Sequence, residues 1–189
     1  MNNAAENRRK KALLIVNPCA GKNRTRSDLG EIVNAFPDGV FDFTIKYTTC
    51  QGDAVNIARD FAEGHDLVIC CGGDGTLNET VNGIMRLPRE KRPPLSYLPG
   101  GSTNDFAASL SISSDPALAA QSAMRLQPRD LDVGVFNEKN FVYVASFGAF
   151  TRTAYTVPQD IKNMFGHFAY LLEGVKDLET LCPYPMKIT

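Results

Sequence analysis

Apolar segments of strand length alternate with segments of helical periodicity along the first two-thirds of the chain. Four continuous or alternating apolar segments predict strands, at residues 12–16, 40–47, 67–71 and 95–98. Four segments with apolar residues at helical spacing predict helices, at residues 29–36, 54–62, 77–85 and 117–126. Strands that alternate with helices in this way predict an α/β fold, with a mostly parallel sheet covered by helices on both faces.

Residues that start and stop helices stand at the boundaries of these segments. Ser27 is an N-cap candidate for the first helix, and Gly64 is a stop signal after the second. Asp115 and Pro116 predict the start of the last helix, with proline in its first turn. A short additional helix is expected to open near Asn104.

The pattern changes after Arg129, where two strand-like runs predict a β-hairpin. The runs span residues 131–136 and 141–146, and residues 137–140 connect them. Strands that follow one another without an intervening helix are typical of a β-rich structure, so the change marks an expected domain boundary.

The last third of the chain predicts the beginning of a second domain. A helical segment at about 158–181 and a strand-like segment at 186–189 follow the hairpin. We expect an α/β domain over residues 1–128 and the start of a β-rich domain over residues 129–189, within a longer two-domain protein.

Composition and charge narrow the classes of function. Of 189 residues, 43% are hydrophobic and 22% are charged, as in ordinary globular proteins. The formal net charge of -1 argues against broad electrostatic capture of nucleic acid. The basic run from Arg8 to Lys11 is interpreted as the solvated start of a strand, and contact with acidic lipid headgroups is the alternative.

The sequence predicts neither a membrane span nor a disulfide framework. No apolar stretch approaches the ~18 residues that cross a bilayer, and the polar N-terminus lacks a signal core. The 5 cysteines show no metal-ligand spacing and predict no zinc site. We expect a cytoplasmic protein that is not transmembrane.

Glycine-rich turns follow three of the predicted strands. They are Asn17-Pro18-Cys19-Ala20-Gly21-Lys22, Gly72-Gly73-Asp74-Gly75-Thr76 and Pro99-Gly100-Gly101-Ser102-Thr103-Asn104-Asp105. In an open parallel sheet such turns lie beyond the carboxyl ends of the strands, where ligands bind. Glycine lets the backbone approach a ligand closely, and the free N–H groups of a helix N-terminus suit phosphate. The sequence therefore predicts a phosphate site built from three turns.

Each turn also has a purely structural interpretation. Thr76 and Glu79 have the spacing of a capping box, and Asn17 begins a common Asn-Pro turn. Residues 102–105 are all N-cap types. These interpretations do not explain Asp74, because a carboxylate repels phosphate unless a cation bridges them. Asp74 therefore points to Mg²⁺ with nucleotide phosphates.

Together the motifs resemble the diacylglycerol kinase catalytic domain family, which includes bacterial lipid kinases and is related to sphingosine and ceramide kinases. The resemblance covers nearly the whole chain. It rests on five motifs. N-P-x-x-G begins at Asn17, and the threonine before G-D-A is Thr48. G-G-D-G-T-x-N-E-x-x-N-G begins at Gly72, P-x-G-T-x-N-D-F at Pro99 and K-x-x-x-G-x-x-A-Y at Lys162. Ser102 stands at the usual threonine position of the fourth motif.

The resemblance implies an ATP-dependent lipid kinase, in which a lipid hydroxyl attacks the γ-phosphate of ATP and diacylglycerol becomes phosphatidic acid. The implied nucleotide contacts are Asn17, Thr48, Gly72, Gly73, Asp74, Gly75, Thr76, Leu77, Asn78, Glu79 and Ser102. The implied Mg²⁺-linked carboxylates are Asp74, Asp105 and Asp132, with Asp74 as the catalytic residue. The resemblance also implies peripheral association with the membrane surface that holds the lipid, and it allows a homodimer.

Two alternatives stay open. One is a NAD-kinase-like enzyme of the same fold, against which the element from Pro99 to Phe106 counts. The other is a nucleotide-binding fragment without activity. The family's complete β-sandwich domain, with the acidic residue proposed as general base in bacterial members, is expected beyond the end of this sequence.

Overall fold

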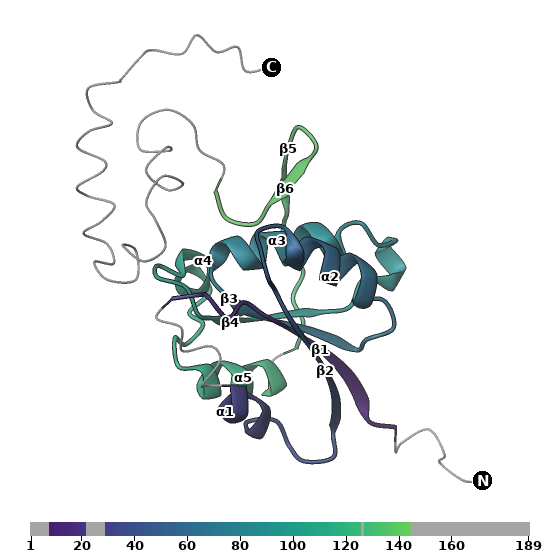
Figure 1. Ribbon diagram of the computed structural model, residues 1–189, viewed down its shortest axis with the longest axis vertical. Coiled ribbons are helices and arrows are strands. Elements are labelled where there is room, and N and C mark those ends of the chain that lie inside the picture. Colours follow the sequence, from purple (N-terminus) through teal and green to yellow (C-terminus); the bar gives the residue numbers. More distant parts are fainter. Residues whose placement is uncertain (1–7, 22–28, 126, 145–189) are drawn as a thin grey trace. The chain divides into compact units, whose positions relative to one another are not determined.

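A four-stranded parallel sheet lies at the centre of the described part of the chain (Figure 1). The computed structural model describes residues 8–21, 29–125 and 127–144. The strands are β1 (Lys10–Val16), β2 (Phe41–Tyr47), β3 (Leu67–Gly72) and β4 (Leu95–Pro99), in the order β2-β1-β3-β4. All neighbouring pairs are parallel, so the predicted strands and their arrangement are confirmed.

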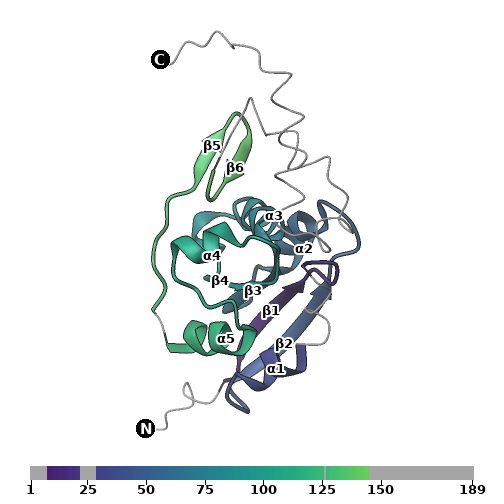
Figure 2. The same ribbon diagram turned by 90° about the vertical axis from the view of Figure 1, so that its left-hand side faces the viewer.

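Helices cover both faces of this sheet (Figures 1 and 2). On one face lie α1 (Leu29–Asn34) and α5 (Pro116–Arg125). On the other lie α2 (Asp53–Phe61), α3 (Asp74–Ile84) and the short α4 (Asp105–Ser109), while a 3-10 turn, η2 (Arg89–Lys91), precedes β4. The predicted start of α5 is confirmed, since Leu118 N donates to Asp115 Oδ1 at 2.9 Å.

The burial of the strands explains their sequence patterns. Alternate side chains point to opposite faces of a strand. Both faces of β1 are covered, so Leu13 packs with the α2 layer and Leu14 with the α1 and α5 layer, both fully buried. The edge strand β2 alternates instead, and its Phe41 and Phe43 rings pack against Phe36 with centroids 5.6 and 5.3 Å away. A central strand therefore has a continuous apolar run, and the edge strand does not.

The predicted hairpin is present, but its turn is shorter than the sequence suggested. The antiparallel strands are β5 (Gly134–Phe136) and β6 (Lys139–Phe141), joined by two residues. Asn137 adopts a φ of 55°, which its short polar side chain tolerates, and this permits the tight connection. Lys139 and Asn140 consequently belong to the second strand, not to the loop.

The chain divides into two compact units, Met1–Tyr143 and Val144–Thr189, and only Val144 of the second is described. The domain change expected after residue 128 stays a prediction. The helix expected at 158–181, the strand at 186–189 and the N-cap at Ser27 lie outside the described residues. None of the helices in the described ranges is long and apolar enough to cross a bilayer.

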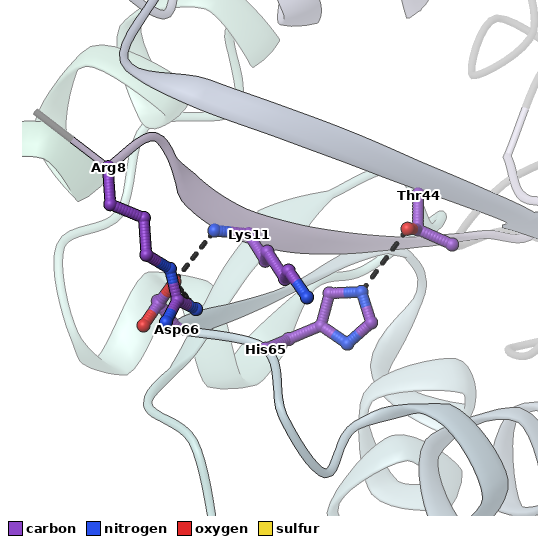
Figure 3. A network of polar contacts seen from close by, with 5 residues as sticks. All are labelled: Arg8, Lys11, Thr44, His65 and Asp66. Atoms are coloured by element: carbon purple, nitrogen blue, oxygen red, sulfur yellow. Dashed lines mark hydrogen bonds and ion pairs between the residues drawn. The ribbon is translucent and has the colours of Figure 1, made fainter.

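The basic run lies at the amino-terminal end of β1, where acidic side chains meet it. Figure 3 shows one of them, Asp66, beside Arg8 and Lys11. Arg9 pairs with Asp42 at 3.2 Å. Asp66 pairs with Arg8 at 3.7 Å and accepts a hydrogen bond from the backbone N–H of Lys11 at 2.7 Å. The amino ends of parallel strands lie at the edge of the sheet opposite their carboxyl ends. The four residues of the run are exposed, on the edge away from the glycine-rich turns, and contact with acidic lipid headgroups stays a prediction.

Arg92 caps the carboxyl end of α3, and we expect its loss to destabilise the fold. Its guanidinium donates to Leu87 O at 2.9 Å and to Met85 O at 3.0 Å. Arg92→Ala should lower the free energy of unfolding by about 1–3 kcal/mol, the usual worth of hydrogen bonds to a charged group. Urea denaturation measures this change. The exposed neighbour Arg89 is the control, because Arg89→Ala should stay within about 0.5 kcal/mol of the parent. Equal effects of the two variants would contradict the cap.

Candidate functional site

The turns that follow the four strands meet at one edge of the sheet. Parallel strands bring their carboxyl ends to the same edge, so residues 17–21, 48–52 and 100–104 lie beside the start of α3. Backbone hydrogen bonds tie neighbouring turns together: Gly100 N donates to Gly72 O at 2.7 Å, and Asn17 N donates to Cys71 O at 2.9 Å. The three glycine-rich turns therefore form one structure, as the sequence predicted.

Glycine is required where these turns touch. A Cβ on Gly21, whose φ is +56°, would lie 2.4 Å from the carbonyl oxygen of Gly100. A Cβ on Gly101 would lie 2.6 Å from Gly73 Cα. Real Cβ atoms do not approach other atoms so closely, so the turn after β4 packs directly on the turns after β1 and β3 only because these residues are glycines.

Asn17 links the first turn to α3. Its Oδ1 accepts from Cys19 N at 2.9 Å, which is the predicted Asn-Pro turn, and its Nδ2 donates to Thr76 Oγ1 at 2.9 Å. Thr76 is buried in turn, and a Cβ on Gly72 would lie 2.8 Å from its side chain. Asn17, Gly72 and Thr76 therefore have a structural role in the site, because they hold the first turn, the end of β3 and the start of α3 together.

The N-terminus of α3 has no side-chain cap. The helix begins at Asp74 after an extended Gly73, and Leu77 N makes its first helical hydrogen bond, to Gly73 O at 3.0 Å. The backbone amides of residues 74–76 precede that bond, so the helix does not use them. The capping-box interpretation is therefore wrong, because Thr76 lies inside the first turn and accepts from Asn17.

Glu79, the other member of the expected capping box, supports a different turn. Its Oε1 accepts from Gly52 N at 2.9 Å, where Gly52 has a φ of 89° at the start of α2. In the same turn, hydrogen bonds from the Thr49 hydroxyl and amide hold the pKa of Asp53 below its ordinary value. Glu79 thus ties the turn after β2 to α3.

Asp74 receives donors from the turn after β4. Its Oδ2 accepts from Asp105 N at 3.0 Å, and its Oδ1 accepts from Phe106 N at 3.4 Å. The hydroxyl of Thr103 lies 3.5 Å from Oδ2. Asp74 therefore caps α4 from another element, a structural role that the sequence did not predict. Three of its four contacts with donors are at 3.4 Å or more, so its oxygens keep capacity for a further ligand.

Two residues of the site were not among the predicted ligand contacts, Tyr97 and Asn104, although Asn104 was expected to begin the short helix. The Tyr97 hydroxyl lies 3.4 Å from Asp74 Oδ1 and 3.4 Å from Asn104 Oδ1, and burial, then the charge of Asp74, raises its pKa well above the ordinary value. Asn104, with φ 55°, closes the turn by bonding both N and O of Gly101. A tyrosine in a strand that ends at a glycine turn was the available signal for Tyr97.

The three carboxylates implied for a metal do not form a cluster. Asp74 and Asp105 are neighbours through the amide contact, and Asp132 is exposed. Within the described ranges, no group of three or more His, Cys, Asp or Glu side chains could hold a metal ion. Mg²⁺ bound with nucleotide phosphates needs only one or two protein carboxylates, and Asp74 fits that smaller requirement.

The other predicted contacts differ in what they offer a ligand. Leu77 is a packing residue, because its side chain is 1% exposed beside Cys70 and Tyr97 and its N–H is bonded within the helix. Thr48 is 8% exposed and its N–H donates to Val16 O at 2.9 Å. Gly75 and Ser102 are exposed and therefore open to a ligand. Asn78 is only half-buried, but its Oδ1 is buried and has no hydrogen-bond partner within the described part of the chain.

Comparison with known proteins agrees with this arrangement. Residues 11–136 match the family model of the diacylglycerol kinase catalytic domain. The chain is 37% identical over 181 residues to a protein named diacylglycerol kinase from Bacillus subtilis (strain 168), covering 95% of this chain and 59% of that protein. A protein of the same name from Staphylococcus aureus (strain MRSA252) is 33% identical, with 95% and 57% covered.

A solved structure has the same fold. The crystal structure of a diacylglycerol kinase from Bacillus anthracis str. Sterne superposes with a TM-score of 0.61 at 38% identity, covering 70% of this chain and 45% of that one. The chain spans about three-fifths of the length of its Bacillus subtilis and Staphylococcus aureus relatives, at 59% and 57%. It belongs to the diacylglycerol kinase catalytic domain family.

Proposed function

We propose that this chain is the nucleotide-binding part of a lipid kinase, which transfers the γ-phosphate of ATP to the hydroxyl of diacylglycerol and gives phosphatidic acid. The observation that carries the proposal is the uncapped N-terminus of α3, which begins at Asp74 where three glycine-rich turns are packed together. A helix N-terminus with unused amides is a site for phosphate, and a carboxylate beside it suits a bridging cation.

The nucleotide phosphates would lie against the amides of residues 74–76. Gly75 supports this placement, since a Cβ there would meet nothing within 4 Å and the backbone is exposed. The exposed Ser102 hydroxyl is a further group for polar atoms of the nucleotide, as is Asn78 Oδ1, which has no hydrogen-bond partner among the described residues. Thr48, in contrast, would support the site from beneath its surface.

Asp74 would hold a Mg²⁺ ion together with the phosphates. The ion, when bound, neutralises charge that develops on the transferring phosphoryl group. The protein's own contribution is to orient Asp74, through the amides of Asp105 and Phe106 and the hydroxyl of Tyr97. A tyrosine keeps its proton at neutral pH, and burial, then the charge of Asp74, raises the pKa of Tyr97 further, so its hydroxyl remains a donor to Asp74.

The lipid substrate is proposed from the relatives, which are named diacylglycerol kinases. The acceptor would be reached by peripheral association with a membrane surface. Nucleotide binding without transfer is the second candidate, because the chain spans 59% of its Bacillus subtilis relative and the rest of that protein has no counterpart here.

The test is transfer of label from γ-labelled ATP to diacylglycerol in mixed micelles. We expect labelled phosphatidic acid that disappears with EDTA and with micelles that lack diacylglycerol. Label on NAD in place of lipid would contradict the proposal and support a NAD-kinase-like enzyme. Magnesium-dependent ATP binding without any transfer would support the second candidate.

Gly75→Ala separates ligand approach from turn geometry. Alanine is favoured in helices and has open space at this position, so the free energy of unfolding should stay equal or rise by up to about 1 kcal/mol. The new methyl group would stand between the phosphates and the amides, and affinity for Mg-ATP should fall at least about 10-fold, or about 1.4 kcal/mol. Calorimetry measures the affinity. An unchanged dissociation constant would mean that Gly75 is only a turn residue.

A further inference from the structure

We propose that Asn82 is a positioning residue of the phosphoryl-transfer site, because it fastens the β5–β6 hairpin to α3, the helix whose first residue is Asp74. The inference rests on the proposed function for its catalytic consequence. The anchoring itself depends only on contacts of the described residues. Asn82 and Gly83 end the long glycine-rich signature of the sequence, and their contacts are with β6 and α2: Asn82 bonds Asn140, and Gly83 lies against Val55 and Ala58.

The contact is made between the carboxamide of Asn82 and one residue of β6, mainly through the backbone of that residue, since Asn140 Nδ2 also donates to Asn82 Oδ1 at the longer distance of 3.4 Å. Asn82 Nδ2 donates to Asn140 O at 2.9 Å, and Asn140 N donates to Asn82 Oδ1 at 3.1 Å. Asn82 Nδ2 also donates to Asn78 O within α3, at 2.8 Å. The carboxamide of Asn82 thus pairs with β6 as the peptide group of a neighbouring strand would. We call the two hydrogen bonds between Asn82 and the backbone of Asn140 the Asn82–Asn140 clasp.

The clasp uses backbone groups that the hairpin leaves free. Opposite residues in an antiparallel pair alternate between hydrogen-bonded and non-bonded positions. Asn140 is opposite Val135, and its N–H and C=O both bond Asn82, so this is a non-bonded position of the hairpin ladder. A two-stranded hairpin is only marginally stable by itself. Asn82 therefore supplies pairing that the hairpin needs at its outer edge.

The clasp joins the hairpin to the candidate site through one face of a helix. Asp74, Asn78 and Asn82 are spaced four residues apart, which places them along the same side of α3. The turn after β4 orients Asp74, and Asn82 holds the hairpin two helical turns further along α3. Val142, just after β6, packs in the same apolar cluster as Leu77 and Tyr97. The chain enters its second unit at Val144, so the clasp fixes the last anchored strand before that unit.

The consequence expected for the reaction is selective. The groups that would hold the nucleotide lie at the N-terminus of α3, and Asn82 lies two helical turns further along, so loss of the clasp should leave the dissociation constant for Mg-ATP within about twofold. Transfer to lipid should fall, since the hairpin would no longer be fixed to the helix that begins at Asp74. We expect kcat/KM for diacylglycerol to drop about 10-fold or more, the scale of two lost hydrogen bonds.

The experiment compares Asn82→Ala, Asn140→Pro and Asn140→Ala by hydrogen exchange of the segment 134–143, calorimetric titration of Mg-ATP and transfer to diacylglycerol. Asn140→Pro removes the N–H that bonds Asn82 but no ladder bond, because Asn140 is at a non-bonded position of the hairpin, where proline is tolerated. Asn140→Ala keeps both backbone groups and, like Asn140→Pro, loses the 3.4 Å side-chain contact with Asn82 Oδ1, so it controls for that contact. We expect the first two variants to raise the exchange rate of the hairpin about 10-fold or more, and Asn140→Ala to resemble the parent.

Four results would overturn parts of the proposal. Unchanged exchange in Asn82→Ala, or equal effects of Asn140→Ala and Asn140→Pro, would show that the clasp does not hold the hairpin. Faster exchange with unchanged transfer would show anchoring without a role in the reaction. A parent chain that binds no nucleotide and transfers nothing would refute the proposed function and the positioning role, while exchange would still decide the anchoring.

Discussion

Asp74→Asn is expected to abolish phosphoryl transfer and most Mg-ATP affinity while the fold keeps its stability. The asparagine retains an oxygen for the amide of Asp105, which now bonds Asp74 Oδ2 at 3.0 Å. It loses the charge that a magnesium ion requires. Because a bound metal is worth several kcal/mol in such reactions, the rate of transfer should fall by about 100-fold or more. The change in the free energy of unfolding should stay within about 1 kcal/mol, the usual worth of one charge near a helix N-terminus.

Asp74→Ala is the companion variant, since it removes the acceptor as well as the charge. The amides of Asp105 and Phe106 would lose their acceptor, so α4 should become less stable by about 1–2 kcal/mol, as after loss of an N-cap. Mg-ATP binding should be lost in both variants. Retained affinity together with a large loss of stability in Asp74→Asn would mean that this carboxylate only caps α4, and the metal assignment would be withdrawn.

Gly83→Ala is expected to cause a large loss of stability. Gly83 lies where α3 packs against α2, and a Cβ there would be 2.4 Å from Val55 O and 2.5 Å from Ala58 Cβ. Backbone cannot move aside as a flexible side chain can, so the two helices would have to separate. We expect the free energy of unfolding to fall by about 3 kcal/mol or more, at the upper end of overpacking effects. Urea denaturation at constant m-value measures it.

Gly30→Ala is the matched control, because Gly30 also lies inside a helix but has nothing within 4 Å of the added carbon. Alanine is favoured over glycine in helices by about 1 kcal/mol, so this variant should be as stable as the parent or slightly more so. If Gly83→Ala matched Gly30→Ala, the close packing of α2 on α3 would be contradicted.

The fold was predictable because its signals are local. Continuous apolar runs marked β1 and β3 as central strands, and Asp115 with Pro116 marked the start of α5. The hairpin turn was predicted too long, since nothing in the sequence shows that Asn137 adopts a positive φ. That conformation depends on the cross-strand register, which is a tertiary property.

The site was predictable as a place but not as a set of contacts. Glycine-rich turns after parallel strands must meet at one edge, and they do. Thr76 and Glu79, however, satisfied a local capping rule by spacing while their partners, Asn17 and Gly52, lie on other elements. The role of Tyr97 also depends on strands coming together. Such long-range pairings are invisible to rules that act over four residues.

The central claim is most directly tested by calorimetric titration of Mg-ATP into this 189-residue chain, with EDTA and NAD titrations beside it. We predict one ATP site that needs magnesium, that does not bind NAD, and that Asp74→Asn eliminates. Binding of NAD in place of ATP, or ATP binding that neither EDTA nor Asp74→Asn alters, would contradict the assignment of the α3 N-terminus and Asp74 as a magnesium-nucleotide site.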